Sequence, residues 1–147
     1  MGKALRLTFD IYPVDEEATK NAVEKYLLQA REYKVTEYIP LEQKITAGFE
    51  PRYGSPYDIS KPVERIAIQN VDEPERRRRH VERAERAIAR LGSRQQELIR
   101  KKYMEDDNVM DFTVAQDIGY SDRQYRRYKS IALFRLAGIL GLVKLRE

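Results

Sequence analysis

The chain lacks cysteine altogether and has a single histidine among its 147 residues. The absence of thiols excludes a disulfide framework, a thiolate metal site and a cysteine nucleophile, and it fits a reducing cytoplasm. The histidine, His80, follows four arginines, a setting that favours a surface residue over a metal ligand or a general base. We therefore expect a cytoplasmic protein.

The chain also has little that would suit a membrane protein or an enzyme. No stretch approaches the roughly 18 uninterrupted apolar residues of a membrane span. The N-terminal residues MGKALRLTFDIYPVDEE reach acidic residues before an apolar run develops, unlike a secretory signal. Glycine-rich phosphate loops, nucleophile elbows and zinc motifs are absent. We predict no membrane location, no enzyme activity, no metal site and no cofactor.

Four carboxylates lie close together at Glu105, Asp106, Asp107 and Asp111. They lack the ligand spacing and the central glycine of a calcium-binding loop. An acidic loop between helices, with Asp111 as a helix cap, is the favoured interpretation. The alternative is a divalent-metal nuclease that uses the three aspartates.

Basic charge is concentrated near the C-terminus. Residues 112–147 hold seven Lys or Arg residues against three acids, a net charge of +4 that equals the net charge of the whole chain, so residues 1–111 are neutral. A localised cationic surface is typical of nucleic-acid binding, because neutralised phosphates release counterions. A solvated charged helix is the plainer alternative. The helical pattern of the same region favours DNA.

That region is predicted to form consecutive helices with a tight turn between the last two. Gly119 supplies the backbone freedom for the turn. Ser121 and Gln124 fit a capping box at the start of a new helix. The pattern predicts a helix-turn-helix over about residues 111–137, with residues 122–137 as a recognition helix in the major groove.

The predicted recognition helix has two faces. Tyr125, Tyr128, Ala132 and Leu136 form an apolar stripe at helical spacing, and we expect both tyrosines in the core. Tyr120, in the turn, is expected to be free to reach a phosphate. The residues expected to bind DNA lie at the helix start and on the other face: Ser121, Asp122, Arg123, Gln124, Arg126, Arg127, Lys129 and Ser130.

Upstream, residues 5–11 alternate between apolar and polar side chains, as in a half-buried strand. Residues 44–49 are the candidate partner strand, and an extended arm is an equal alternative. A helix with one apolar face is predicted from Asp15 to about Tyr33. Four prolines and two glycines punctuate residues 35–62, so we expect an irregular connector there, either a linker or a segment that a partner orders.

Helical spacing resumes over residues 63–70, and residues 72–75, Asp-Glu-Pro-Glu, are typical of a helix start. The helix that follows carries a short apolar seam from Val81 to Leu91, which requires a partner helix. Ser93 and Gln96 predict a second capping box.

The arginine run, Arg76–Arg79, is the densest basic stretch of the chain. Two interpretations stay open. The run contacts a phosphate or RNA polymerase, or it forms an intrahelical salt-bridge network with nearby glutamates at spacings of three and four.

Together these elements predict an all-α fold, a helical bundle with a C-terminal helix-turn-helix. Residues 1–62 form an N-terminal arm, a helix and an irregular connector, and residues 63–147 form a helical DNA-binding domain. Apolar residues continue past Leu136, more than a three-helix unit of this size needs. This surplus predicts either a homodimer or a cover for the N-terminal helix.

The residues LGSRQQELIRKKY and TVAQDIGYSDRQYRRYKSIALFRLAGIL, about the last third of the chain, resemble the region 4 helix-turn-helix of bacterial sigma factors. Leu91-Gly92 stands where those proteins have Leu-Pro. The resemblance implies base contacts from Asp122, Arg123, Arg126 and Arg127. Asp122 departs from the pattern, because an acid only accepts hydrogen bonds, for instance from cytosine N4. Nothing resembles sigma region 2, so an autonomous promoter-melting factor is not implied.

Over a longer span, including FEPRYGSP, ERIAIQNVDEPERRRRHVERAERAIARL and YMEDD, the chain is similar to the ArpU-like phage transcriptional regulators. This similarity implies a phage or prophage protein that acts in a bacterial host cell. We expect a sequence-specific regulator that binds double-stranded DNA and activates late genes, with host RNA polymerase and a second copy as possible partners. The rival is a phage terminase small subunit, which also joins a helix-turn-helix to an oligomerising helical region.

Overall fold

The computed structural model describes residues 13–42 and 56–147, with side chains of the second range from residue 61 onward. The elements in chain order are α1 (Glu16–Val35), α2 (Pro56–Ala89), α3 (Ser93–Ile99), a π-helical turn η2 (Arg100–Met104), α4 (Asp111–Ile118) and α5 (Asp122–Leu140). The predicted all-α fold class is confirmed. The strand expected at residues 5–11 and its partner at 44–49 lie outside the described residues. Within the described ranges, no helix is long and apolar enough to cross a bilayer.

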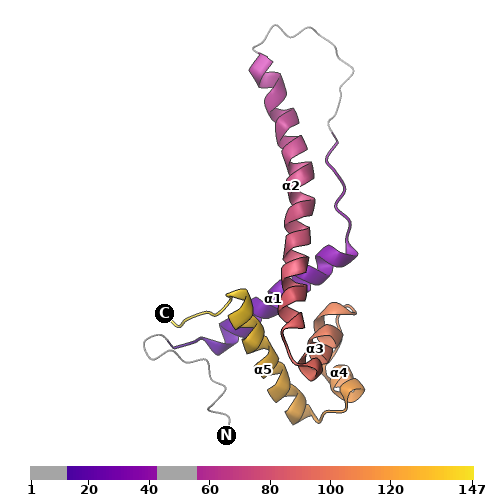
Figure 1. Ribbon diagram of the computed structural model, residues 1–147, viewed down its shortest axis with the longest axis vertical. Coiled ribbons are helices and arrows are strands. Elements are labelled where there is room, and N and C mark those ends of the chain that lie inside the picture. The colour runs from indigo at the N-terminus through magenta and orange to yellow at the C-terminus, as the bar shows by residue number, and fades with distance from the viewer. Residues whose placement is uncertain (1–12, 43–55) are drawn as a thin grey trace.

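The core lies where α1 crosses the lower part of α2, with α3, α4 and α5 packed below the crossing (Figure 1). All the helices contribute to one apolar cluster, so α1 shares its core with the helix-turn-helix. Its fully buried residues include Val23 and Leu27 of α1, Ala84 and Ile88 of α2, Leu98 and Ile99 of α3, Val114 of α4, and Ala132 and Leu136 of α5.

The C-terminal tail lies against the start of α1. Asp15 caps α1 by accepting a hydrogen bond from the Ala18 amide at 3.1 Å, and its own amide donates to the Lys144 carbonyl at 2.8 Å. Val14 and Leu145 form an isolated antiparallel bridge. The tail after α5 therefore lies over the start of α1, which agrees in part with the expected cover for the N-terminal helix, although Ile139 and Leu145 are 39% and 44% exposed. The homodimer stays a prediction.

The long helix α2 corrects the expected connector. Helix begins at Pro56, within residues 35–62, and continues through Pro62 and Pro74, so residues 72–75 lie inside a helix and do not start one. Each proline removes one backbone donor from the helix. The upper part of α2 extends away from the core as an arm (Figure 1), and its residues are mostly exposed. Solvent can therefore reach the carbonyls that lose a donor.

Two expected caps are also wrong. Gly92 occupies the N-cap of α3, and Ser93 is its first residue. The side-chain amide of Gln96 donates to the Leu91 carbonyl at 2.8 Å, just past the end of α2. Met110 occupies the N-cap of α4, and Asp111 lies in its first turn. The Gln96 side chain binds the chain just before α3, and the Asp111 side chain binds Tyr125 of α5, so neither completes a local cap.

Candidate nucleic-acid interface

The turn between α4 and α5 has the predicted geometry. Gly119 ends α4 in the left-handed conformation, with φ of 77°. Glycine adopts this conformation without strain, whereas residues with a Cβ are strained in it. The Tyr120 amide donates to the Ala115 carbonyl at 2.9 Å. The Ser121 hydroxyl accepts from the Gln124 amide at 3.2 Å, while the Gln124 side chain accepts from the Ser121 amide at 3.1 Å. The predicted capping box is confirmed, and it fixes where α5 begins.

The first turns of α5 present arginines to solvent. Arg123, Arg126 and Arg127 are exposed, and none of the three makes an ion pair or a hydrogen bond with a described residue. Asp122 is also exposed, in the first turn, where the helix dipole favours an acid. Ser121 and Gln124 are exposed but bond each other, and Ser130 is half-buried. Most of the expected residues thus form an outward face, and its three arginines have no partner among the described residues.

Lys129 does not lie on that outward face. Its side chain is only 19% exposed, and its ammonium contacts the Asp111 carboxylate at 3.2 Å. The buried Tyr125 hydroxyl donates to the same carboxylate at 2.6 Å. This network joins the first turn of α4 to α5, so Lys129 holds the two helices together, and its expected contact with DNA stays a prediction.

The Asp111 carboxyl titrates in an unusual setting. Burial alone would raise its pKa, but the hydrogen bond from Tyr125 and the charges of Lys129 and Lys102 together lower the pKa below its ordinary value. Burial, followed by the bond to Asp111, raises the pKa of Tyr125. The carboxylate therefore stays ionised, and the phenol stays protonated, near neutral pH.

Of the three tyrosines in the turn and α5, one agrees with the expectation and two differ from it. Tyr125 is buried as predicted, whereas Tyr128 is 36% exposed. Tyr120 is half-buried against the core, with its ring 5.0 Å from the Tyr128 ring and the Arg94 guanidinium 4.9 Å from its ring centroid. Tyr120 therefore packs in the turn against the core and against Arg94 of α3, whereas we expected a side chain free to reach a phosphate.

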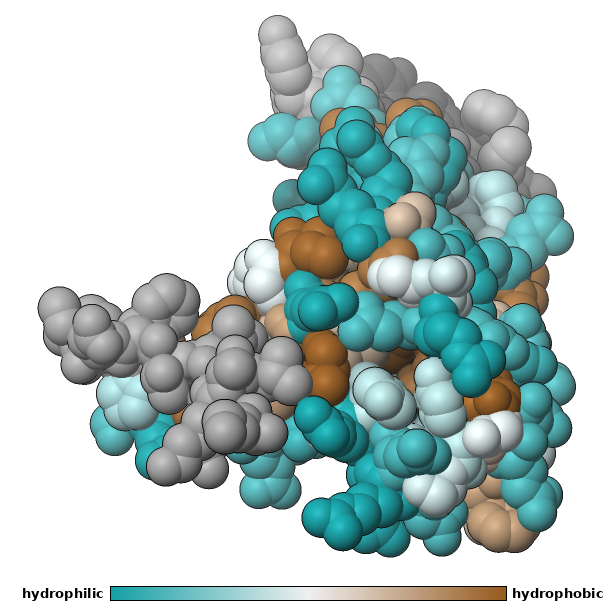
Figure 2. All heavy atoms as spheres, turned by 60° about the horizontal axis from the view of Figure 1, so that its bottom comes forward, coloured by the Kyte–Doolittle hydropathy of each residue, from teal (hydrophilic) through white to brown (hydrophobic). Residues whose placement is uncertain are grey.

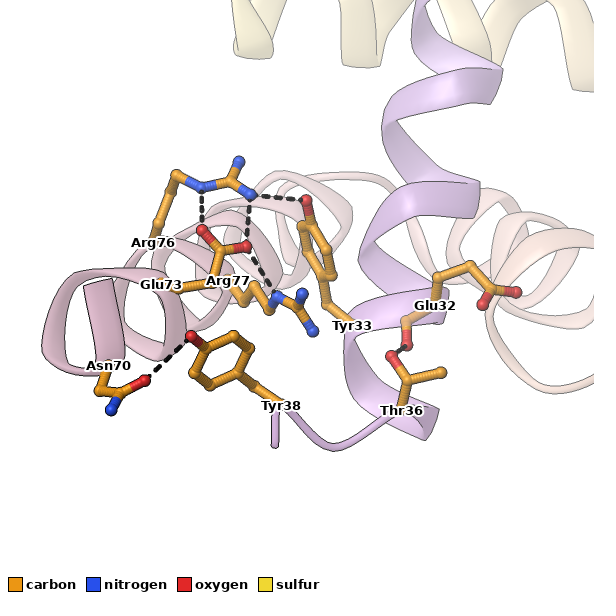
Figure 3. A network of polar contacts seen from close by, with 8 residues as sticks. All are labelled: Glu32, Tyr33, Thr36, Tyr38, Asn70, Glu73, Arg76 and Arg77. Atoms are coloured by element: carbon orange, nitrogen blue, oxygen red, sulfur yellow. Dashed lines mark hydrogen bonds and ion pairs between the residues drawn. The ribbon is translucent and has the colours of Figure 1, made fainter. Parts of the chain in front are cut away.

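The arginine run is neutralised within its own helix. Glu73 accepts from both Arg76 and Arg77, at 2.7 and 2.9 Å, as Figure 3 shows. Arg78 pairs with two further glutamates of α2, at 2.8 and 2.7 Å, and Arg79 lies 3.8 Å from one of them. The hydrogen bonds from Arg76 and Arg77 lower the pKa of Glu73 to about 2. These contacts form the intrahelical network that was one of the two open interpretations.

His80 and the acidic loop have structural roles. The His80 ring stacks on Tyr26 with centroids 3.8 Å apart, and its Nε2 lies 3.0 Å from the Tyr26 carbonyl, so it is half-buried between helices. Asp107 bonds Arg31 of α1 at 2.9 Å. Among the described side chains, no three His, Asp or Glu residues are placed to hold a metal ion.

The structure has a second basic surface, which was not predicted from the sequence. Arg79, Arg83, Arg86 and Arg90 line a groove of about 610 Å³ between α2 and the end of α5. Their spacings of four, three and four residues place them on one helical face. That spacing was the signal in the sequence, but the denser arginine run beside it was more conspicuous.

The end of the molecule that carries the helix-turn-helix is mostly hydrophilic, with apolar side chains in small separate groups (Figure 2). The exposed apolar residues of α4 and its cap are Met110 and Phe112. A polar surface of this kind is more typical of contacts with nucleic acid than of an obligate protein interface.

Comparisons with known proteins give one distant relationship. The chain is 32% identical over 80 residues to Protein Gp66 of Listeria phage A118. The match covers 54% of this chain and 54% of Gp66, so the chain spans about half the length of that protein. No protein-family model matches the chain, and no solved structure matches it. The chain is therefore a helical protein with similarity to a phage protein.

Proposed function

We propose that this protein is a sequence-specific, double-stranded-DNA-binding transcriptional regulator that activates phage late genes. The observation that carries the proposal is the capped start of α5, which presents Arg123, Arg126 and Arg127 to solvent without a partner in the described part of the chain. Arginine pairs its fork of donors with guanine O6 and N7. Asp122 accepts hydrogen bonds, as from cytosine N4.

The packing of α5 supports this role. One side of the helix is held by buried Tyr125, Ala132 and Leu136, and the Asp111 network ties it to α4. The opposite side is free over its first two turns. A rigid helix with one free polar face has the shape that a major groove of about 12 Å width admits. The similarity to a phage protein supports the phage setting.

The experiment is a selection of the protein's preferred duplex from a random library, followed by binding measurements on the selected and a scrambled duplex. Arg126→Ala and Arg127→Ala should each weaken binding to the selected duplex by about 1 to 3 kcal/mol, or roughly 5- to 150-fold. Losses on the scrambled duplex should be smaller. Arg78→Ala removes an arginine that is paired within α2, and it should leave both affinities unchanged.

Two results would contradict the proposal. A library that yields no preferred sequence would rule out sequence-specific binding. Equal losses on both duplexes for both α5 variants would show that these arginines touch only phosphates. Activation is tested separately, by transcription in vitro with a bacterial RNA polymerase from a promoter that carries the selected site, and the protein should raise transcript yield.

The second candidate is a phage terminase small subunit. The arm of α2 favours it, because Val63, Ile68 and Val71 are exposed there and are available for oligomerisation. A terminase subunit would form a large ring, whereas a regulator would be a monomer or a dimer. The mass in solution from light scattering separates these two functions.

A further inference from the structure

The groove between α2 and α5 is lined by arginines together with apolar Ala87, Ile139 and Leu140. Arg83 donates to the Leu140 carbonyl at 2.9 Å, which fixes its guanidinium at the groove. Arg86 and Arg90 make no ion pair or hydrogen bond with any described residue. Glu82 is the one carboxylate among the lining residues, and it is bound to Arg78 at 2.7 Å. The groove therefore has an uncompensated positive charge, unlike the neighbouring arginine run.

A second hollow, of about 410 Å³, continues this surface toward the turn. Its lining includes Arg94, Arg135, Tyr120 and Tyr128, and Arg135 bonds Gln95 of α3 at 3.0 Å. Arg135 and residue 139 of the first groove follow Tyr128 by seven and eleven residues. These spacings place the three side chains on one stripe of α5. The two hollows thus follow one another along the same flank of α5.

We name this surface the arginine flank: Arg83, Arg86, Arg90, Arg94 and Arg135. It begins beside Tyr120 in the turn of the helix-turn-helix and ends at the C-terminus of α5. It draws most of its charge from residues 83–94, outside the C-terminal segment whose net charge is +4.

We propose that the arginine flank binds the sugar-phosphate backbone of the duplex whose bases α5 reads. The inference rests on the proposed function and extends it. Guanidinium groups match phosphate oxygens in geometry and stay charged at every physiological pH. Arg83 to Arg90 span about 10 Å of helix, which corresponds to about three phosphates of one strand at roughly 3.4 Å of axis each.

An acidic segment of another protein is the other class of ligand with suitable charge. Continuity decides for DNA, because the flank starts at the turn that positions the base-reading arginines. In the proposed complex the duplex lies across the start of α5, so that its backbone passes Tyr120 and reaches the flank on the adjoining side of the helix. Cations that adjoin the base-reading helix also supply the register that phosphate contacts give to a DNA-binding protein.

The test compares two double variants of the full chain that remove equal charge from α2. Arg86→Gln with Arg90→Gln removes unpaired arginines of the flank, and Arg76→Gln with Arg78→Gln removes paired arginines of the run. The dissociation constant is measured against salt, from about 50 to 200 mM, on the selected duplex and on a random 30-bp duplex. Each lost phosphate contact lowers the log–log salt slope by about 0.9, so the flank variant should lose about 1.8 on both duplexes. The run variant should keep the wild-type slope.

A third variant, Arg86→Lys with Arg90→Lys, keeps the charge and should keep most of the slope. Circular dichroism melting checks that each variant is folded. Arg86 and Arg90 are exposed, so their substitutions should leave the fold intact. If the salt slope is unchanged in the flank variant while Arg126→Ala still weakens specific binding, only the DNA-binding role of the flank is refuted. An acidic segment of another protein is then the remaining ligand. Equal slope changes in the flank and run variants also refute the DNA-binding role of the flank. A wild-type protein that binds neither duplex overturns the proposed function and the flank together.

Discussion

Replacing Tyr125 with phenylalanine tests whether the Asp111 network sets the packing of α5 on α4. The ring of Tyr125 is buried, and its hydroxyl donates to the Asp111 carboxylate at 2.6 Å. Phenylalanine keeps the ring and removes only this bond. A hydrogen bond to a charged group stabilises a fold by about 1.5 to 3 kcal/mol. The Asp111 side chain is 51% exposed and keeps part of its hydration, so we expect a loss near 1.5 kcal/mol.

The assay is a double-mutant cycle in urea. The free energy of unfolding is measured for the wild type, Tyr125→Phe, Asp111→Ala and the double variant at pH 7. The coupling between the two positions should be about 1 to 1.5 kcal/mol. Lys129 contributes separately to the Asp111→Ala loss, and the cycle cancels that contribution.

The pH dependence has a definite sign. Because the pKa of the Asp111 carboxyl is lowered in the folded protein, its contribution to stability is fully present above about pH 4, its unfolded pKa. It is lost as the pH falls through the lowered pKa. The wild type should therefore lose more stability than Asp111→Ala between about pH 5 and pH 2. Additive single losses at pH 7, or parallel pH profiles of the two proteins, would refute this account of the network.

Four further substitutions test single features. Gly119→Ala should cost about 1 kcal/mol of unfolding free energy from its positive φ alone, because no atom lies within 4 Å of the added Cβ; a loss above about 3 kcal/mol would indicate a clash. Tyr103→Phe should raise the melting temperature, since the buried Tyr103 hydroxyl has no hydrogen-bond partner among the described atoms, and a clear drop would contradict this. Arg31→Met should cost about 2 kcal/mol in urea denaturation, because it strips the Met104 carbonyl of a buried donor at 3.1 Å. Asp107→Ala, which removes only the exposed partner of Arg31, should cost less than about 1 kcal/mol.

Local signals in the sequence identified the helix-turn-helix. The capping box of Ser121 and Gln124 and the turn at Gly119 depend on atoms within five residues of each other. Such contacts form wherever the surrounding chain is placed, so a sequence pattern is sufficient to predict them. The apolar faces of α1 and α5 were predictable for the same reason, because helical period alone determines which residues share a side.

Long-range packing determined what local patterns could not. Lys129 lies at helical spacing beside the exposed arginines of α5, yet Asp111, 18 residues away, holds its ammonium against α4. Helix α2 continues through two prolines because its upper part is an exposed arm. The arginine flank exists only because α5 ends against α2. The sequence by itself determined where α1 and α5 start, since the Asp15 and Ser121 caps depend on neighbours along the chain. The tertiary structure alone decided which charges far apart in the sequence are paired, because such an ion pair forms with whichever opposite charge packing brings within a few ångströms.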